Sequence, residues 1–196
     1  QIYGDIYDDS MWLIDLVENL LSVTRIEEGR MQIRQSAELV DEVIKEALKH
    51  TGQSRTGRTI KVEEEDELIL AKMDARLIVQ VLINLIGNAV KYTPQGTDIT
   101  VRVKKEKAEN AERSQVIISV CDLGNGIPDD RKERVFDMFY TGSDQVADSR
   151  RSLGLGLGLC RSIINAHGGK IWISDNIPHG AVVTFTLPAE EVALNE

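Results

Sequence analysis

Residues 73–94, MDARLIVQVLINLIGNAVKYTP, decide the fold of this chain. Apolar side chains recur at steps of three and four from Leu77 to Val90, which predicts a long amphipathic helix with one buried face. The helix is expected to end just before Pro94, because the residue that precedes a proline avoids helical geometry. No other part of the chain has so strong a helical pattern.

The segments around this helix alternate between strand and helix patterns. Residues 99–103 and 116–121 are expected to form one hairpin, and residues 171–174 and 182–187 another. Residues 59–65 are expected to pair with residues 68–71 across an acidic turn. Mixed strands and helices predict an α/β (α+β) two-layer sandwich, a mixed sheet covered on one face by helices. The expected strands are residues 31–34, 59–65, 68–71, 99–103, 116–121, 171–174 and 182–187, and the other expected helices are 36–50, 129–138 and 157–166.

A long N-terminal helix is expected to precede the sandwich. Residues 2–28 carry one broad apolar stripe between charged positions, which is typical of a helix that pairs with another helix, and Gly29 ends the pattern. We therefore expect an arm at residues 1–30 and a globular domain at residues 31–196. Because the pattern begins almost at Gln1, the chain is expected to be a piece of a larger protein.

Composition excludes several classes of protein. Of 196 residues, 42% are hydrophobic and 28% charged, which is globular, and 32 acidic against 23 basic residues give a net charge of −9 that disfavours nucleic-acid binding. No apolar stretch reaches the roughly 20 residues that span a bilayer. Cys121 and Cys160 stand among apolar neighbours, so both are expected to be buried, reduced thiols.

The polar side of the central helix carries the first candidate site. Helical spacing places Asn84, Asn88 and Lys91 on one face, followed by Tyr92. An amide oxygen is a possible Mg²⁺ ligand, and a lysine one turn further can reach a phosphate. The alternative is that these side chains simply face water.

A second candidate follows a predicted strand at Asp122, Gly124 and Gly126. Alternate glycines let the backbone approach a ligand closely, and a carboxylate at a strand end can accept a hydrogen bond from an exocyclic amine. An ordinary turn explains the same residue types equally well.

The third candidate is the run of Gly154, Gly156 and Gly158 at the start of a helix, where backbone N–H groups favour phosphate. The spacing fits neither a P-loop nor a Rossmann fingerprint. The preceding residues 141–153 are polar and without periodicity, which at that length indicates a functional loop or disorder. The aromatic residues 136–140 are expected to anchor one end of that loop. No catalytic or metal-binding histidine cluster is visible.

In this order, the amide helix, the Asp-Gly turn, the aromatic anchor and the glycine-rich helix start resemble the N, G1, F and G2 boxes of sensor histidine kinases. The resemblance covers residues 12–188, nearly the whole chain. It implies the Bergerat (GHKL) fold for the domain and the second helix of a dimerisation hairpin for the arm. Residues 139–157 and 174–176 further resemble the potassium-responsive class of these kinases.

The resemblance also implies roles for individual residues. Many members of the family carry Arg where this chain has Thr141, so contact with the γ-phosphate would fall to Arg150 or Arg151, and Pro178 stands where a glycine is common. The implied catalytic residues are Asn84 and Lys91, the implied Mg²⁺ ligand is Asn88, and the other implied ATP contacts are Lys91, Tyr92, Asp122, Gly124, Gly126, Ile127, Gly154, Leu155, Gly156, Leu157, Gly158 and Leu159.

The implied function is that of a protein-histidine kinase that uses ATP and Mg²⁺. It would transfer the γ-phosphoryl group to a histidine upstream of Gln1 and then to an aspartate of a response regulator. The implied setting is the cytoplasmic domain of a membrane-anchored bacterial sensor that dimerises through the hairpin. The alternatives are a nucleotide-binding regulatory module without transfer activity and another GHKL ATPase.

Overall fold

The computed structural model describes residues 33–51, 59–65, 68–107, 114–140 and 154–190, together with five separate positions of the N-terminal segment. Those five positions, Ile14, Val17, Leu21, Thr24 and Arg25, are helical. The rest of the expected arm and its boundary at residue 30 lie outside the described residues. The N-terminal helix as a whole and the two-part division of the chain therefore stay predictions.

The domain is built on one mixed sheet of seven strands. Six of them follow the order β1-β3-β7-β5-β4-β2, and β6 pairs with β7. All pairs are antiparallel except β2 with β4. The elements are β1 (Ser36–Leu39), α2 (Val40–His50), β2 (Ile60–Glu64), β3 (Leu70–Met73), α4 (Ala75–Tyr92), β4 (Ile99–Lys107), β5 (Ser114–Cys121), α5 (Asp129–Lys132), the 3-10 turn η1 (Arg134–Phe136), α7 (Gly156–Ala166), β6 (Ile171–Asp175) and β7 (Ala181–Glu190).

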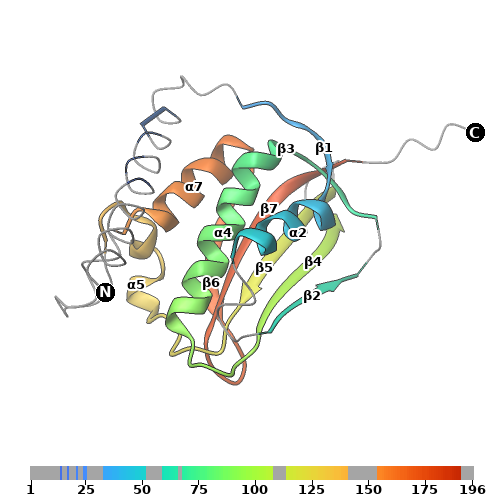
Figure 1. Cartoon of the computed structure of the whole chain (residues 1–196). Coiled ribbons are helices and arrows are strands. Elements are labelled where there is room, and N and C mark those ends of the chain that lie inside the picture. The colour runs from blue at the N-terminus through green and yellow to red at the C-terminus, as the bar shows by residue number, and fades with distance from the viewer. Residues whose placement is uncertain are drawn as a thin grey trace, which may run out of the picture.

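Helices α2, α4 and α7 lie together on one face of the sheet (Figure 1). Helix α4 buries residues such as Leu77, Val81 and Leu85 at helical spacing, and β4 buries every second residue from Ile99 to Val103. The two periodicities meet in one hydrophobic core between the layers. The predicted two-layer sandwich is confirmed.

Two expectations for the N-terminal part of the domain were wrong. Of the strand expected at residues 31–34, residues 33 and 34 are not in a strand and residues 31 and 32 lie outside the described residues; Ser36 does not begin a helix. The strand is Ser36–Leu39, which pairs with Leu70–Met73, and helix α2 begins only at Val40. A long-range pairing therefore overrides the local helix signal at Ser36.

The expected pairing of residues 59–65 with 68–71 was also wrong. Strand β2 pairs in parallel with β4, whereas β3 pairs with β1 and β7, so the two strands stand in different parts of the sheet. Residues 129–138 form the short pieces α5 and η1 in place of one helix. The hairpins β4–β5 and β6–β7 are confirmed.

Cys121 and Cys160 are both free and buried, as expected. Within the described ranges, no group of three or more His, Cys, Asp and Glu side chains could hold a metal ion. None of the described helices is long and apolar enough to cross a membrane.

Candidate functional site

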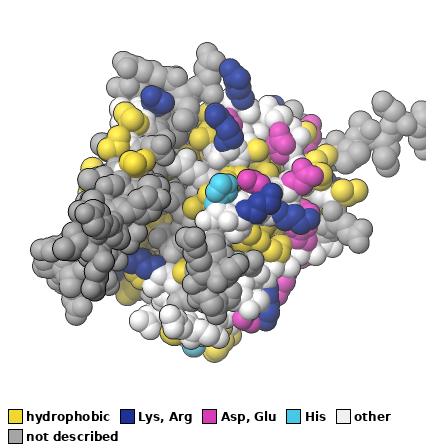
Figure 2. Space-filling view, viewed as in Figure 1, with side chains coloured by type: hydrophobic (Ala, Val, Ile, Leu, Met, Phe, Trp, Pro, Cys, Tyr) yellow, Lys and Arg dark blue, Asp and Glu magenta, His cyan; other side chains and the backbone are white. Residues whose placement is uncertain are grey.

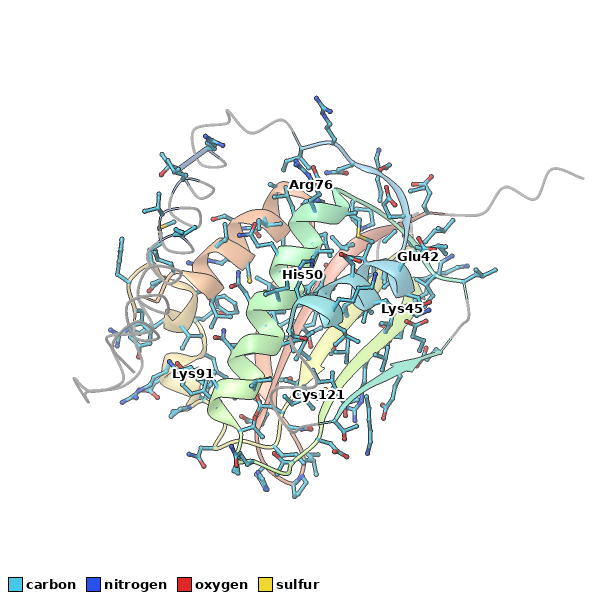
Figure 3. The ribbon with its side chains drawn as sticks, viewed as in Figure 1. Glu42, Lys45, His50, Arg76, Lys91 and Cys121 are labelled. Atoms are coloured by element: carbon cyan, nitrogen blue, oxygen red, sulfur yellow. The ribbon has the colours of Figure 1, made fainter. Side chains whose placement is uncertain are left out.

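The polar residues predicted on helix α4 become more exposed toward its carboxyl end. Asn84 and Asn88 are half-buried, while Lys91 and Tyr92 are exposed at the carboxyl end of the helix. Figure 3 shows Lys91 at that end and Arg76 at the other. The Nζ atom of Lys91 lies 5.0 Å from the centre of the Tyr92 ring, within the range of a cation–π contact.

Asn84 contributes a polar group without a partner. Its Nδ2 atom is buried and has no hydrogen-bond partner among the described residues. Its Oδ1 atom lies 3.5 Å from the place where a Cβ atom on Gly156 would stand, so the amide faces the first turn of α7. The structure thus brings the first and third candidate stretches together.

The Asp122 turn lies against the carboxyl end of α4. The Oδ1 atom of Asp122 accepts hydrogen bonds from the backbone N–H of Gly124 at 2.8 Å and of Ala181 at 3.1 Å. A Cβ atom on Gly124 would stand 2.6 Å from the carbonyl oxygen of Tyr92, so only glycine fits there. The other oxygen, Oδ2, receives no hydrogen bond from the described residues and remains available to a ligand.

Two residues that the sequence analysis missed support this turn from the β6–β7 loop. Asn176 donates a hydrogen bond from Nδ2 to the carbonyl oxygen of Asp122 at 2.7 Å. His179 donates one from Nδ1 to the carbonyl oxygen of Gly124 at 3.0 Å. No spacing in the sequence points to either residue, because their role depends on the β6–β7 hairpin lying beside β5.

The glycine-rich stretch forms the entry to α7, which begins at Gly156. Gly154 has a φ of +66°, and a Cβ atom there would stand 2.4 Å from the carbonyl oxygen of Tyr140. The backbone N–H of Phe139 donates to the carbonyl oxygen of Gly154 at 3.1 Å, so residues 139 and 154 are in direct contact. The first turn of α7 leaves backbone N–H groups free to bind an anion.

Four apolar residues of the predicted site are buried or pack against other apolar side chains. Leu155 and Leu159 are buried, and Leu157 packs against the core. Ile127 packs on a small cluster formed by Phe136, Ile173 and Ala181. Arg150 and Arg151 lie outside the described residues, and so does Thr141. The part of the predicted site that the structure describes therefore consists of Asn84, Asn88, Lys91, Tyr92, the Asp122 turn and the start of α7.

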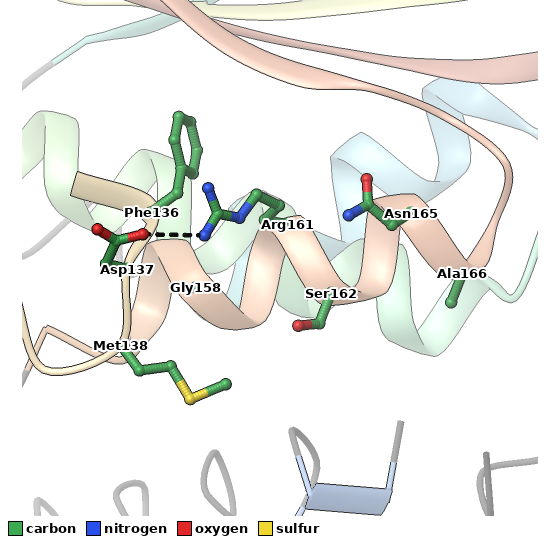
Figure 4. A pocket seen from close by; sticks show the side chains of 8 residues that line it. All are labelled: Phe136, Asp137, Met138, Gly158, Arg161, Ser162, Asn165 and Ala166. Carbon is green, nitrogen blue, oxygen red and sulfur yellow. Dashed lines mark hydrogen bonds and ion pairs between the residues drawn. The ribbon is translucent and has the colours of Figure 1, made fainter. Parts of the chain in front are cut away.

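A separate hollow of about 520 Å³ lies between η1 and the outer side of α7 (Figure 4). Phe136, Arg161 and Asn165 line it, and Arg161 pairs with Asp137 at 3.2 Å. Gly158 is the one predicted site residue in its lining. This hollow is therefore distinct from the group formed by Asn84, Asp122 and the start of α7.

The surface around α2 mixes charges of both signs. Figure 2 shows basic and acidic side chains side by side on this face. Along α2 they form ion pairs between Lys45 and Asp41 and between Lys49 and Glu46. Charges of both signs therefore alternate along this helix.

The site combines three features of a nucleotide-binding α/β domain. They are the unpartnered buried amide of Asn84, the free carboxylate oxygen of Asp122 and the glycine backbone at the start of α7. The chain belongs to the family of histidine kinase-, DNA gyrase B- and HSP90-like ATPases, whose family model matches residues 73–191. The match confirms the family that the sequence resembles.

Similar proteins narrow the class further. The chain is 40% identical over 190 residues to the sensor protein KdpD of Clostridium acetobutylicum; the match covers 97% of this chain and 20% of that protein. Its structure matches histidine kinase ThkA in complex with response regulator protein TrrA with a TM-score of 0.67 and 28% identity, over 91% of this chain and 49% of that one.

A third similar structure is full-length ShkA in complex with AMPPNP. Its TM-score is 0.76 at 22% identity, over 94% of this chain and 37% of that one, and it supports the fold. Together the similarities identify a sensor histidine kinase ATPase domain. The chain spans about a fifth of the length of its KdpD relative.

Proposed function

We propose that this domain binds ATP and transfers its γ-phosphoryl group to a histidine that lies outside the chain, and that the phosphoryl group then passes to an aspartate of a response regulator. The similarity to KdpD and to the kinase in the ThkA–TrrA complex supports this proposal. Such transfer depends mainly on positioning and charge neutralisation, which the described residues can supply.

The unpartnered Nδ2 atom of Asn84 is the observation that carries the proposal. A buried N–H group without an acceptor costs about 1–3 kcal/mol, so a domain that retains one is expected to use it. Rotation of the amide, whose Oδ1 atom faces the first turn of α7, would bring Nδ2 to a phosphate oxygen bound there. The same oxygen would also receive hydrogen bonds from the free N–H groups of the helix start.

Asp122 would select the base. Because its Oδ1 atom already accepts two backbone N–H groups, Oδ2 is left to accept from the exocyclic amine of adenine. Guanine would place a carbonyl oxygen at the same position, and two acceptors repel each other. Gly124 and Gly126 would let the backbone approach the base, with Tyr92 packed beside it.

The exposed end of α4 would supply the positive charge that the triphosphate needs, from a lysine and from a bound Mg²⁺. Lys91 can approach a phosphate as a point charge, and the amide oxygen of Asn88 suits Mg²⁺ as a neutral hard ligand. A bound Mg²⁺ would neutralise phosphate charge, and one protein ligand is compatible with its preference for water and phosphate oxygens. Contact of Arg150 or Arg151 with the γ-phosphate stays a prediction.

The proposed setting is a homodimer whose catalytic domain lies on the cytoplasmic side of a membrane-anchored sensor. Ile14, Val17 and Leu21 lie at i, i+3 and i+7 positions, and each is about half exposed, at 50%, 52% and 48%. An apolar stripe of this kind supports pairing with another helix. Potassium sensing stays a prediction.

Calorimetric titration with AMPPNP and Mg²⁺ tests the nucleotide site. We expect micromolar binding by the wild-type chain, about tenfold or more loss in Asp122→Asn, and a weaker Mg²⁺ dependence in Asn88→Ala, which removes the proposed oxygen ligand. The phosphoryl-transfer step is tested by supplying a hairpin with its phosphoacceptor histidine in trans and assaying for phosphohistidine. Tight binding without any phosphohistidine would contradict the kinase assignment and favour a regulatory module.

A further inference from the structure

The loop between β6 and β7 holds the Asp122 turn by its carbonyl groups. Asn176 donates to the carbonyl oxygen of Asp122 at 2.7 Å, and His179 donates to that of Gly124 at 3.0 Å. The two side chains therefore fix both ends of the tripeptide that carries the free carboxylate oxygen. We call Asn176 and His179 the turn brace.

Asn176 is itself held in a single orientation. Its Oδ1 atom accepts from the backbone N–H of Ile177 at 3.0 Å, and its own backbone N–H donates to the carbonyl oxygen of Gly180 at 3.0 Å. The first bond identifies which atom of the amide is the acceptor, so Nδ2 must face Asp122. A donor that is oriented in advance loses little conformational entropy when it holds its partner.

Gly180 allows the loop and the turn to come this close. Its φ is +110°, and a Cβ atom there would stand 2.0 Å from the carbonyl oxygen of Asp122. The next residue, Ala181, donates its backbone N–H to Oδ1 of Asp122. The loop therefore contacts Asp122 at its side chain as well as at its carbonyl group.

We propose that Asn176 and His179 are positioning residues for base selection. By fixing the backbone of the turn, they hold the two N–H donors on Oδ1 in place, and thereby direct Oδ2 at the exocyclic amine of adenine. This inference deepens the proposed function and rests on it. The contribution of the turn brace is expected to appear in the discrimination between bases, since a misdirected carboxylate weakens the one contact that distinguishes them.

Removal of the brace is tested with two triphosphates. ATP carries an amine at the position where inosine triphosphate carries a carbonyl group, and both present the same phosphates. We expect His179→Ala to lower the ratio of ATP to inosine triphosphate affinity roughly three- to tenfold, mainly by weakening ATP. His179 is exposed, so the variant is expected to fold, which thermal melting checks.

A conservative variant separates positioning from packing. His179→Asn places an N–H donor at the same number of bonds from the backbone as Nδ1, so it is expected to restore the ratio. Asn176→Asp removes the other donor while keeping the acceptor for Ile177, and is expected to lower the ratio in the same way. An equal loss for both triphosphates, an unchanged ratio in His179→Ala, or no recovery in His179→Asn would each overturn the inference.

The wild-type titration tests the proposed function independently. If the wild type prefers ATP to inosine triphosphate and the variants keep the same affinity ratio, the role of the turn brace in base selection is overturned and the proposed function stands. Absence of ATP binding by the folded wild-type chain would overturn the proposed function, and the inference with it.

Discussion

The backbone N–H of Asp74 donates a hydrogen bond to the Nε2 atom of His167, and the two nitrogen atoms are 3.0 Å apart. Asp74 stands at the start of α4 and His167 at the end of α7. The other ring nitrogen, Nδ1, lies 2.8 Å from the carbonyl oxygen of Ile163 and must donate to it. The imidazole is therefore neutral, with its proton on Nδ1. It links the two helices that carry the candidate site.

The link is expected to weaken in acid. His167 is buried, and burial lowers the pKa of its imidazole despite the opposing effects of the Ile163 carbonyl group and Asp74. Below the ordinary histidine pKa of about 6.5, the unfolded chain takes up a proton that the folded chain resists. The histidine's contribution to stability is therefore present above that pH and lost below it, by up to about 1.4 kcal/mol per pH unit.

Urea unfolding of the wild type and of His167→Gln between about pH 8 and pH 5.5 measures this effect. Glutamine can still accept from Asp74, but it does not titrate. We expect the wild type to lose more stability on acidification than the variant. Burial raises the pKa of Glu64, an effect of opposite sign that is common to both proteins and cancels in the comparison. Identical pH dependence in the two proteins would contradict the assignment.

Gly154 is expected to tolerate no side chain. Gly154→Ala would force a residue with a Cβ atom to a φ of +66° and against the carbonyl oxygen of Tyr140. We expect a loss of about 1–3 kcal/mol in the free energy of unfolding, measured in urea. Gly87→Ala is the matched control, because a Cβ atom there meets nothing within 4 Å on the exposed side of α4, and it is expected to add about 0.5–1 kcal/mol. A similar result for both variants would refute the role of the Gly154 conformation.

Asn84 is expected to lower the free energy of unfolding of the domain and to raise its affinity for nucleotide. Asn84→Leu replaces an unpartnered amide with an apolar group of similar size, so the free energy of unfolding should rise by about 1 kcal/mol while AMPPNP affinity falls tenfold or more. Asn165, exposed on α7, provides the control, since Asn165→Leu should change neither quantity appreciably. Wild-type nucleotide affinity in Asn84→Leu would show that the amide does not contact the ligand.

The two thiols are expected to be unreactive in the folded chain. Burial raises the pKa of Cys160 to about 12, and burial also raises the pKa of Cys121. A disulfide reagent at about pH 8 should therefore modify neither cysteine until a denaturant is added. Ser174→Cys, at an exposed position of β6, should add one thiol that reacts at once. Rapid loss of either native thiol would contradict the packing around it.

The sequence predicted the elements whose signals are local. The central helix was evident from the spacing of Leu77, Val81 and Leu85 and from the following proline, and it fixed where Asn84 and Asn88 must face. The two antiparallel hairpins were also evident, because their strands are adjacent in the chain. Asp122 could be singled out because its carboxylate follows a strand and precedes a glycine turn.

The remaining features depend on contacts between distant parts of the chain. Ser36–Leu39 becomes a strand only because β3 offers it a partner, and β2 leaves its sequence neighbour to pair with β4. Asn176 and His179 are ordinary turn residues until the β6–β7 loop meets Asp122. The orphan Nδ2 atom of Asn84 could not be foreseen, because it depends on how closely α7 packs against α4.

The position of β7 bears on how the chain is made. This strand follows the other described strands in chain order, yet it lies inside the sheet, with β5 on one edge and β6 and β3 along the other. During synthesis β3 and β5 leave the ribosome with nothing between them, and their unsatisfied edges are open to wrong pairing. The sheet closes only once Ala181–Glu190 has emerged, so a nascent chain that ends before Ala181 leaves the facing edges of β3 and β5 unpaired.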